Sequence, residues 1–381
     1  MKPTEKRFRC SRRAAACLLA LLLLAGCKDS GEEPTDSPET PSPTASPSPA
    51  VSESVAPTQE QPTESPSVPP ETETVNPLTG EPMDEMRTKS RPVAIMLNNI
   101  TAALPQQGNC GADIIYEAVA EGGITRMLGI YQSVNSVGVI GSVRSARPYF
   151  IELAQGHDAV FVHAGGSEDA YADLEAWSVD HMDGVNGTYS KTGMFWRNPQ
   201  RIAGKNFAVE HSLVTSGDEV WNALAGSGFR LTHSDGWSSA QLFADDGTPE
   251  GGTNAKSVVV SHFGGKATLF RYDLATGLYR VEQYGEAYID GDSGEQVAVT
   301  NVLVLRVQMA DTQDDYNHME LKLTNGDGWY ACGGKVIPIV WEKGEHDQPL
   351  TYRTQTGDPL VLGRGKSYVN LVPQTADITC S

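Results

Sequence analysis

The segment RPYFIELAQGHDAVFVHAGGSEDAYADLEAW, residues 147–177, places a strand pattern between two helix patterns and decides the fold of the first half of the chain. Residues 147–157 carry a proline near the start of a helix pattern, where a helix tolerates it. Residues 158–166 are an apolar run that ends in glycines, which predicts a buried strand. Ser167 is followed by acidic residues, so residues 167–177 are predicted as a second helix. This order indicates a mixed α/β domain.

Neighbouring segments extend this pattern. PVAIMLNN, residues 92–99, predicts a buried strand, and ADIIYEAVAEGG, residues 112–123, fits either a strand or a helix. TRMLGIYQSV, residues 125–134, and VGVIGSV, residues 137–143, predict the two strands of a β-hairpin. NFAVEHSLVTSGDEVWNALAGSG, residues 206–228, contains a further predicted helix.

From about residue 254 the chain changes character. It consists of short runs rich in β-branched and aromatic residues, from KSVVVSHF to SYVNLVP, separated by Gly, Asp and Asn. This pattern predicts a β-sandwich or a curled sheet. We therefore expect an α+β protein, with a mixed α/β domain at residues 76–228, a connecting segment at 229–253, and a mostly-β domain at 254–381.

The N-terminus predicts export and a lipid anchor. A basic head precedes the 11 apolar residues 14–24, too short for a mature membrane span but typical of a signal peptide. The run ends in Leu-Ala-Gly-Cys, which resembles a lipobox, so residues 1–27 are predicted as a lipoprotein signal with Cys27 as the lipidated residue. The alternative is an ordinary secretory signal with a chance cysteine. Residues 28–75, rich in Pro, Ser, Thr and Glu, predict a disordered tether.

The net charge limits the possible partners of the protein, and the cysteine content limits its possible disulfide bonds. The whole chain carries −19, the signal contributes +5 and the tether −9, so residues 76–381 carry −15. An acidic body argues against nucleic acid as a partner. Cys110, Cys332 and Cys380 remain after the signal and Cys27, and either Cys332 pairs with Cys380 or all three are free thiols.

Three arginines, Arg126, Arg144 and Arg147, stand out because basic residues are scarce around them. Between Arg91 and Lys191 no other Lys or Arg occurs, in a chain with an excess of acidic residues. In the hairpin interpretation the three meet at one edge of a sheet. Guanidinium groups gathered there suit the bidentate capture of a carboxylate or a phosphate.

Other side chains are candidates for the same site. His163 ends a predicted strand before a glycine turn, where free N–H groups attract anions. The predicted ligand-binding residues are Arg126, Arg144, Arg147, Glu117, Glu121, His163, Arg197 and Arg201. The structural alternative is that the arginines only pair with Glu117, Glu121 or Glu152, and that His163 is a hydrogen-bonded structural residue.

No cofactor and no metal ion are expected. The chain lacks HExxH, phosphate-loop, dinucleotide-binding and GxSxG patterns. DGDSGE, residues 290–295, is faintly similar to a calcium loop but lacks the remaining ligands, so it is predicted as a polar turn.

Several long segments carry a family resemblance. NPLTGEP, RPVAIMLNN, IGSVRSARPYFIELA and AVFVHAGGS, in this order, resemble the YerB-like lipoproteins, a family of two-domain bacterial envelope proteins. The resemblance covers roughly residues 76–220 and extends to GGKVIPIVWEK and SYVNLVP in the C-terminal part. It implies a location and an architecture, but no catalytic residues. Where the family pattern leads us to expect PHN, this chain has VEHS, which puts a role for His211 in doubt.

A weaker resemblance, in residues 125–147, is to the core of LytR-CpsA-Psr phosphotransferases, although the Asp expected after the turn arginine is absent. The hypotheses are therefore a module that binds an anionic envelope ligand, an envelope glycan or phosphoryl transferase or hydrolase using Glu117 or Glu121, and a protein-binding scaffold. The expected location is extracytoplasmic, on a Gram-positive cell membrane through Cys27. The expected partners are a cell-wall polymer or another envelope protein.

Overall fold

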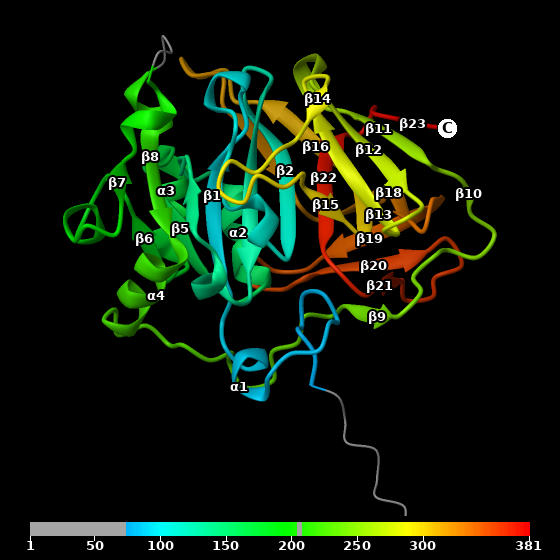
Figure 1. Ribbon diagram of the computed structural model, residues 1–381, viewed down its shortest axis with the longest axis horizontal. Helices are drawn as coiled ribbons and strands as arrows, with labels where there is room; N and C mark the ends of the chain where they lie inside the picture. Colours follow the sequence, from blue (N-terminus) through cyan, green and yellow to red (C-terminus); the bar gives the residue numbers. More distant parts are fainter. Residues whose placement is uncertain (1–73, 204–207) are drawn as a thin grey trace, which may run out of the picture. The chain divides into compact units, whose positions relative to one another are not determined.

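A mixed sheet is the central element of the structure (Figure 1). The structure is a computed structural model, and it describes residues 74–203 and 208–381. The predicted signal peptide, Cys27 and nearly all of the predicted tether lie outside the described residues. The α+β class expected from the sequence is confirmed, because few helices accompany many strands.

Strands from both predicted domains share this sheet. The N-terminal segment contributes, in spatial order, β2 (Ile114–Glu121), β3 (Ile124–Tyr131), β1 (Val93–Asn98), β5 (Val160–His163) and β6 (His181–Asp183). The C-terminal segment contributes β22 (Ser367–Pro373), β16 (Asn301–Asp311), β18 (Asn325–Cys332), β19 (Lys335–Lys343) and β10 (Thr253–Asn254), with β17 (Met319–Lys322) beside β16 and β20 (Leu350–Thr354) beside β19.

The joint between the two segments is the pairing of β22 with β2. β22 lies parallel to β16 on one side and parallel to β2 on the other, with Tyr116 opposite Val369 and Glu117 opposite Asn370. The apolar side chains of β22 are almost completely buried. A strand from the C-terminal end of the chain therefore completes the sheet begun by the N-terminal segment.

Each face of the large sheet has its own apolar core. The face that includes Ala94 and Met96 packs against the helices α2 (Pro148–Gly156) and α3 (Glu168–Ala176). The face that includes Ile95 and Leu97 packs against two further sheets and the helix α4 (Gly217–Ala225). This alternation of neighbouring residues between two cores is the expected period of a buried strand.

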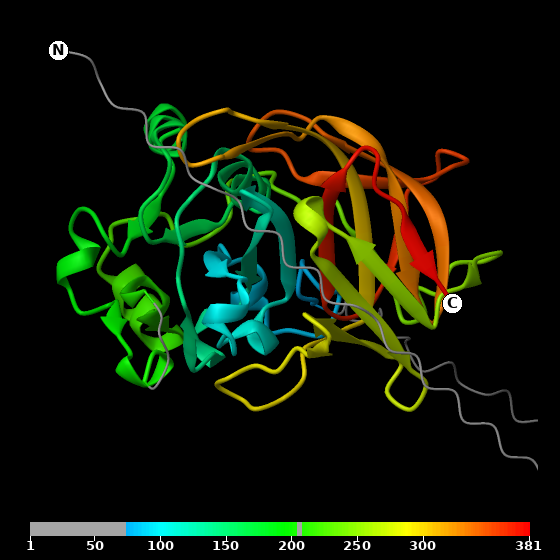
Figure 2. The ribbon, with the colours of Figure 1, turned by 90° about the horizontal axis from the view of Figure 1, so that it is seen from above.

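The second and third sheets both lie on the Ile95 face. The second sheet consists of β14 (Glu286–Ala287), β13 (Leu278–Gln283), β12 (Ala267–Asp273), β11 (Ser257–Ser261) and β23 (Ile378–Cys380), with β15 (Ala298–Val299) beside β13. The third consists of β4 (Val139–Gly141), β8 (Leu213–Ser216) and β7 (Trp196–Arg197). In Figures 1 and 2 the yellow-green strands of the second sheet lie over the red strand β22 and its orange neighbours.

The predicted hairpin of residues 125–134 and 137–143 is wrong. β3 pairs with β2 on one side and with β1 on the other, so both of its edges are occupied. Residues 139–141 instead form β4 and pair with β8. The observed hairpin joins β2 to β3 through Gly122 and Gly123, which both have positive φ angles, as a tight two-residue turn requires.

The predicted buried strands at 92–99 and 158–166 and the helices at 147–157, 167–177 and within 206–228 are confirmed as β1, β5, α2, α3 and α4. The strand alternative for residues 112–123 holds, as β2. Cys110, Cys332 and Cys380 are all free thiols. Among the described residues, no helix has the length and apolar character that crossing a bilayer requires.

The central position of β22 predicts a sharp dependence on the C-terminus. Deleting residues 367–381 removes β22 from between β2 and β16, so we expect the cooperative thermal transition followed by circular dichroism to disappear. Deleting residues 377–381 removes only β23, an edge strand, and should leave a cooperative transition at a lower temperature. A cooperative transition in the longer deletion would contradict this role of β22.

Candidate functional site

Two of the predicted arginines share one carboxylate. Arg126 on β3 donates through Nη2 to Oε1 of Glu121, and Arg147 donates through Nη2 to Oε2 of the same carboxylate at 2.9 Å. Each guanidinium also donates to a backbone carbonyl, Arg126 to Ser145 at 2.9 Å and Arg147 to Ala146 at 2.7 Å. Both arginines are buried, so Glu121 is a bridge between two cations and not a surface ion pair.

The third arginine, Arg144, has no such carboxylate. Within the described part of the chain no hydrogen bond or ion pair joins its guanidinium to another group, and its buried Nε has no hydrogen-bond partner. Burial lowers the pKa of Arg144, the charges of Glu210 and Glu121 raise it, and Arg147 lowers it further. Burial and the nearby charge of Arg147 lower the pKa of Arg126 to about 9. Two of the three guanidinium groups therefore share one carboxylate, and the third forms no ion pair among the described residues. We call Arg126, Arg144, Arg147 and Glu121 the arginine cluster.

The backbone around Arg144 explains how the cluster forms without a hairpin. The N–H of Arg144 donates to the carbonyl of Met96 on β1, and its carbonyl accepts from Ala164, just after β5. Asn98, at the end of β1, is opposite Arg126 in the β1–β3 ladder. The cluster thus lies at the carboxyl ends of the parallel strands β1 and β5. Ligands commonly bind at this edge of an open α/β sheet.

The other predicted site residues have separate positions. Arg197 donates to the carbonyl of Val209 at 2.8 Å, and its charge is among those that lower the pKa of Arg144. Arg201 is fully engaged in holding a loop, because it donates to the carbonyls of Ala103, Pro105 and His211 and to Gln107.

His163 is completely buried, and both nitrogens of its ring lie close to polar groups. Its Nδ1 lies 2.8 Å from the carbonyl of Gly165, and its Nε2 lies 2.9 Å from Nδ1 of His181. Because a carbonyl only accepts, Nδ1 carries the proton and Nε2 accepts from His181. Burial lowers the pKa of His163 to about 4, so the ring is neutral at pH 7.

Glu117 is separate from the arginines, although it is four residues from Glu121 on the same strand. In a regular strand these residues would point to the same face. The β2–β3 register shifts between Val119 and Glu121, which indicates a β-bulge. As a result Glu121 contacts Arg147 at the start of α2, whereas Glu117 contacts Thr268 in the second sheet.

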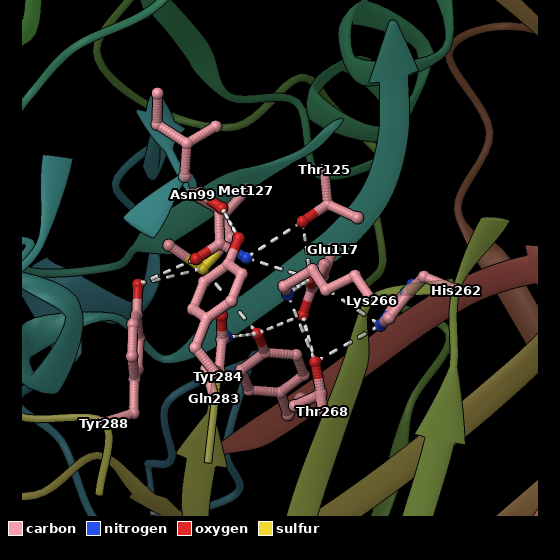
Figure 3. A network of polar contacts seen from close by, with 12 residues as sticks. Asn99, Glu117, Thr125, Met127, His262, Lys266, Thr268, Gln283, Tyr284 and Tyr288 are labelled. Atoms are coloured by element: carbon pink, nitrogen blue, oxygen red, sulfur yellow. Dashed lines mark hydrogen bonds and ion pairs between the residues drawn. The ribbon is translucent and has the colours of Figure 1, made fainter. Parts of the chain in front are cut away.

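Glu117 is the centre of a buried polar network (Figure 3). Its Oε1 accepts from Asn99 at 2.9 Å, from Thr125 at 2.7 Å and from Lys266. Its Oε2 accepts from Thr268 at 3.0 Å and from Tyr368 at 2.6 Å. We call these six residues the Glu117 network. It joins strands β2 and β3 to the second sheet and to β22.

The charge state of the network follows from its burial. Burial raises the pKa of Glu117, but the positive charges and hydrogen-bond donors around it outweigh this effect and hold the pKa well below its usual range. His262 lies 3.6 Å from Oε1, but burial lowers its pKa to about 4 and leaves it neutral at pH 7. Lys266 is therefore the cation that pairs with Glu117 at neutral pH, and the pair has almost no contact with solvent.

The sequence did not point to Lys266, Thr268 or Tyr368 as partners of Glu117. They lie 149 to 251 residues away in the chain. Thr268 and Tyr368 are inside strand patterns that predict only core positions, and Lys266 follows two glycines in a predicted turn. Glu117 carried the one available signal, because it is an acidic residue within the apolar run IIYEAVA. A charged residue that is fully buried requires a partner.

The fold and the cluster together define a class, namely an α+β protein in which two sequence segments share one mixed sheet with a cationic cluster at its carboxyl edge. The chain belongs to the YerB-like family, described as "Protein of unknown function (DUF3048)", whose N-terminal domain matches residues 78–230 and whose C-terminal domain matches residues 258–369. The family predicted from the sequence is thereby confirmed.

A relative and a solved structure support this assignment. The chain is 32% identical over 309 residues to YerB of Bacillus subtilis (strain 168), which is named as a lipoprotein, covering 78% of this chain and 85% of YerB. The crystal structure of YerB from Bacillus subtilis is similar with a TM-score of 0.67 and 30% identity, covering 80% of this chain and 99% of that chain.

The Glu117 network predicts that replacing the Glu117 carboxylate by a neutral amide strongly lowers the stability of the folded protein. Glu117→Gln leaves the buried Lys266 without a counter-charge, so we expect a loss of about 3–5 kcal/mol of unfolding free energy. The double variant Glu117→Gln, Lys266→Met should be more stable than Glu117→Gln alone, because no buried charge remains. Urea unfolding of the two variants and the wild type measures both differences. Equal stability of the two variants would contradict the pairing.

The same carboxylate predicts a pH dependence. The folded pKa of Glu117 is depressed, so its contribution is fully present above its unfolded pKa, near 4.5, and is lost as the pH falls toward the lower folded value. The wild type should therefore lose stability between about pH 5 and pH 2 more steeply than Glu117→Gln does. Parallel slopes for the two proteins would show that Glu117 does not titrate in this way.

Proposed function

We propose that this protein is a lipid-anchored envelope protein that binds an anionic ligand, bearing phosphate or carboxylate, at the arginine cluster. The observation that carries the proposal is the imbalance of charge. Two of the three guanidinium groups bind one carboxylate, Glu121, and the charges of Glu121 and Glu210 are the acidic ones that favour protonated Arg144. The three positive charges of the arginine cluster therefore exceed these two negative charges, and Arg197 adds a further positive charge that acts on Arg144.

An uncompensated cation in a partly buried position destabilises the folded protein. Like charges several ångströms apart repel by on the order of 1–2 kcal/mol per pair at an effective dielectric constant near 20. A bound anion offsets this repulsion and takes hydrogen bonds from the guanidinium of Arg144. Residues 76–381 carry a net negative charge, so the arginine cluster is not part of a generally basic surface. This contrast supports a specific role for the cluster in binding an anion.

The alternative of a transferase or hydrolase has weaker support. Glu117 is fully buried and is paired with Lys266, and Glu121 is bound to two arginines. A general base needs an accessible carboxylate whose pKa suits proton transfer. Neither residue is placed in that way, so a binding role is the better-supported hypothesis.

The proposed location is the extracytoplasmic side of a Gram-positive cell membrane, with a cell-wall polymer or an envelope protein as neighbour. The name of the Bacillus subtilis relative and the lipobox at Cys27 support an anchored protein. The proposal for Cys27 is tested by Cys27→Ala, which should move the protein from the membrane fraction to the soluble fraction, because the acidic tether has no other affinity for lipid. Retention of the variant in the membrane would contradict the anchor.

Anion binding is tested by thermal melts with and without phosphate at fixed ionic strength. A phosphate concentration tenfold above the dissociation constant should raise the Tm of the wild type by a few degrees, about 1.4 kcal/mol of stabilisation. Arg144→Ala should remove this shift at little cost to stability, because its guanidinium has no hydrogen bond in the described part of the chain.

Two variants complete this experiment. Arg271→Ala, which removes an exposed arginine of the second sheet, is the matched control and should keep the phosphate shift. Arg147→Ala should lower the stability without phosphate, because it removes a bond to the bridging Glu121. A phosphate shift of equal size in Arg144→Ala and the wild type would refute the site.

A further inference from the structure

Two Asn-Gly pairs occur in the described part of the chain, and the structure places them in opposite settings. Asn186 and Gly187 belong to an exposed turn that follows β6, whereas Asn325 and Gly326 begin the strand β18. We call residues 183–187 the 183–187 turn. An Asn-Gly pair can react with itself, because glycine has no side chain that shields its backbone nitrogen. Whether it does so depends on how easily the pair changes its local conformation.

The Asn186–Gly187 pair has few local restraints. Both residues are exposed, and Gly187 has a φ angle of +76° with open space where a Cβ would lie. Within residues 74–203 and 208–381 no acceptor binds the N–H of Gly187. The backbone nitrogen of Gly187 can therefore approach Cγ of Asn186 without first breaking a hydrogen bond of its own.

The Asn325–Gly326 pair lacks this freedom. Asn325 is opposite Glu342 and Gly326 is opposite Trp341 in the antiparallel ladder between β18 and β19. A Cβ on Gly326 would lie 2.5 Å from the carbonyl oxygen of Arg306 and 2.7 Å from Nε1 of Trp341, so the backbone there is closely packed. The same dipeptide is thus present in a restrained form that serves as a control within one molecule.

A hydrogen bond to α3 holds the side chain of Asn186. Its amide nitrogen donates to the hydroxyl of Tyr171 at 2.6 Å, and that hydroxyl donates to Oδ2 of Asp183 at 2.6 Å. Burial and the hydrogen bond to Asp183 raise the pKa of Tyr171 to about 12, so the hydroxyl is neutral at pH 7. Asp183 also accepts from the N–H groups of Gly165 and Val185. The amide of Asn186 therefore extends a chain of hydrogen bonds between the 183–187 turn and α3.

We infer that Asn186 is a site of spontaneous deamidation, at which water slowly converts the side-chain amide into a carboxyl group. The backbone nitrogen of Gly187 loses its proton and bonds to Cγ of Asn186, and the amide nitrogen leaves as ammonia. Water then opens the resulting succinimide ring at either of its carbonyl groups, which gives aspartate or isoaspartate at position 186. The overall reaction consumes one water molecule and releases one ammonia, without a change of oxidation state.

The new carboxylate replaces a donor by an acceptor at the contact with α3. The hydroxyl of Tyr171 has one proton, which it donates to Asp183, so the contact with position 186 becomes one between two oxygen atoms that share no proton. The charge of Asp183 adds repulsion between two carboxylates. We expect the modified 183–187 turn to lose its contact with α3. This inference does not depend on the anion site proposed at the arginine cluster.

The location is tested by warm incubation of the full chain at mildly alkaline pH, followed by peptide mapping with mass spectrometry. The peptide that contains Asn186 should gain the mass difference between an amide and a carboxyl group, with isoaspartate as one of the products. It should convert at least about tenfold faster than the peptide that contains Asn325, because Asn325 must first leave the β18–β19 ladder. Equal rates at the two sites, or no conversion at Asn186, would overturn the inference.

The chemistry is tested by the pH and by two variants. The rate at Asn186 should rise with pH, because the attack requires removal of the proton from the Gly187 nitrogen. Asn186→Gln should show far slower conversion at this position, since its longer side chain disfavours closure of the ring. Arg144→Ala should react at the wild-type rate, which separates this site from the proposed anion site. A rate that does not rise with pH, or conversion of Asn186→Gln as fast as the wild type, would refute the mechanism.

The structural consequence is tested with fixed substitutions. Asn186→Asp should lower the Tm by about 1–3 °C relative to Asn186→Ser, a neutral control whose hydroxyl can still donate to Tyr171. In a Tyr171→Phe background this difference should shrink, because no hydroxyl oxygen then faces position 186. The same Tm for Asn186→Asp and Asn186→Ser would show that the carboxylate does not disturb the contact with α3.

Discussion

The buried ion pair between Glu117 and Lys266 is the constraint on which the arrangement of the two segments depends. A carboxylate without solvent contact must have its charge and its acceptor positions satisfied by the protein. Glu117 obtains two donors from the N-terminal segment and three from the C-terminal segment, Lys266, Thr268 and Tyr368. Its ionised form is therefore stable only when β12 and β22 are packed against β2, so one charge couples the second sheet, the joint strand and the N-terminal hairpin.

The strand β2 performs two tasks because its pairing with β3 is irregular. Up to Val119 it follows the regular register, and Glu117 faces the second sheet. After the bulge, Glu121 faces α2 and binds Arg126 and Arg147. The rigid interior and the cationic edge are thus four residues apart in the sequence and on opposite sides of the sheet. The arginine cluster therefore lies beside a buried polar network, while Arg144 has no carboxylate partner among the described residues.

Sequence patterns predicted the local elements well and the pairing of those elements poorly. The period of apolar residues and the cap at Ser167 identified α3, and the proline at 148 identified the start of α2. The hairpin of residues 125–134 and 137–143 was wrong, because a short apolar strand carries no information about which of its edges is taken by a distant strand. β18 escaped prediction, since its first residues, Asn-Gly-Asp-Gly, resemble a turn and form a strand only between β16 and β19.

The sequence by itself determined the acidic body, the scarcity of cations around Arg126, Arg144 and Arg147, and the division into an α/β segment and a β-rich segment. These properties follow from composition and from local periodicity, which need no long-range contact. Only the tertiary structure decided that the two segments share one sheet, that a bulge separates Glu121 from Glu117, and that the rings of Trp177 and His346 stack on each other. Each of these joins residues that are distant in the sequence or depends on a register shift, and pairing over such separations is set by the packing of whole faces and not by any local pattern.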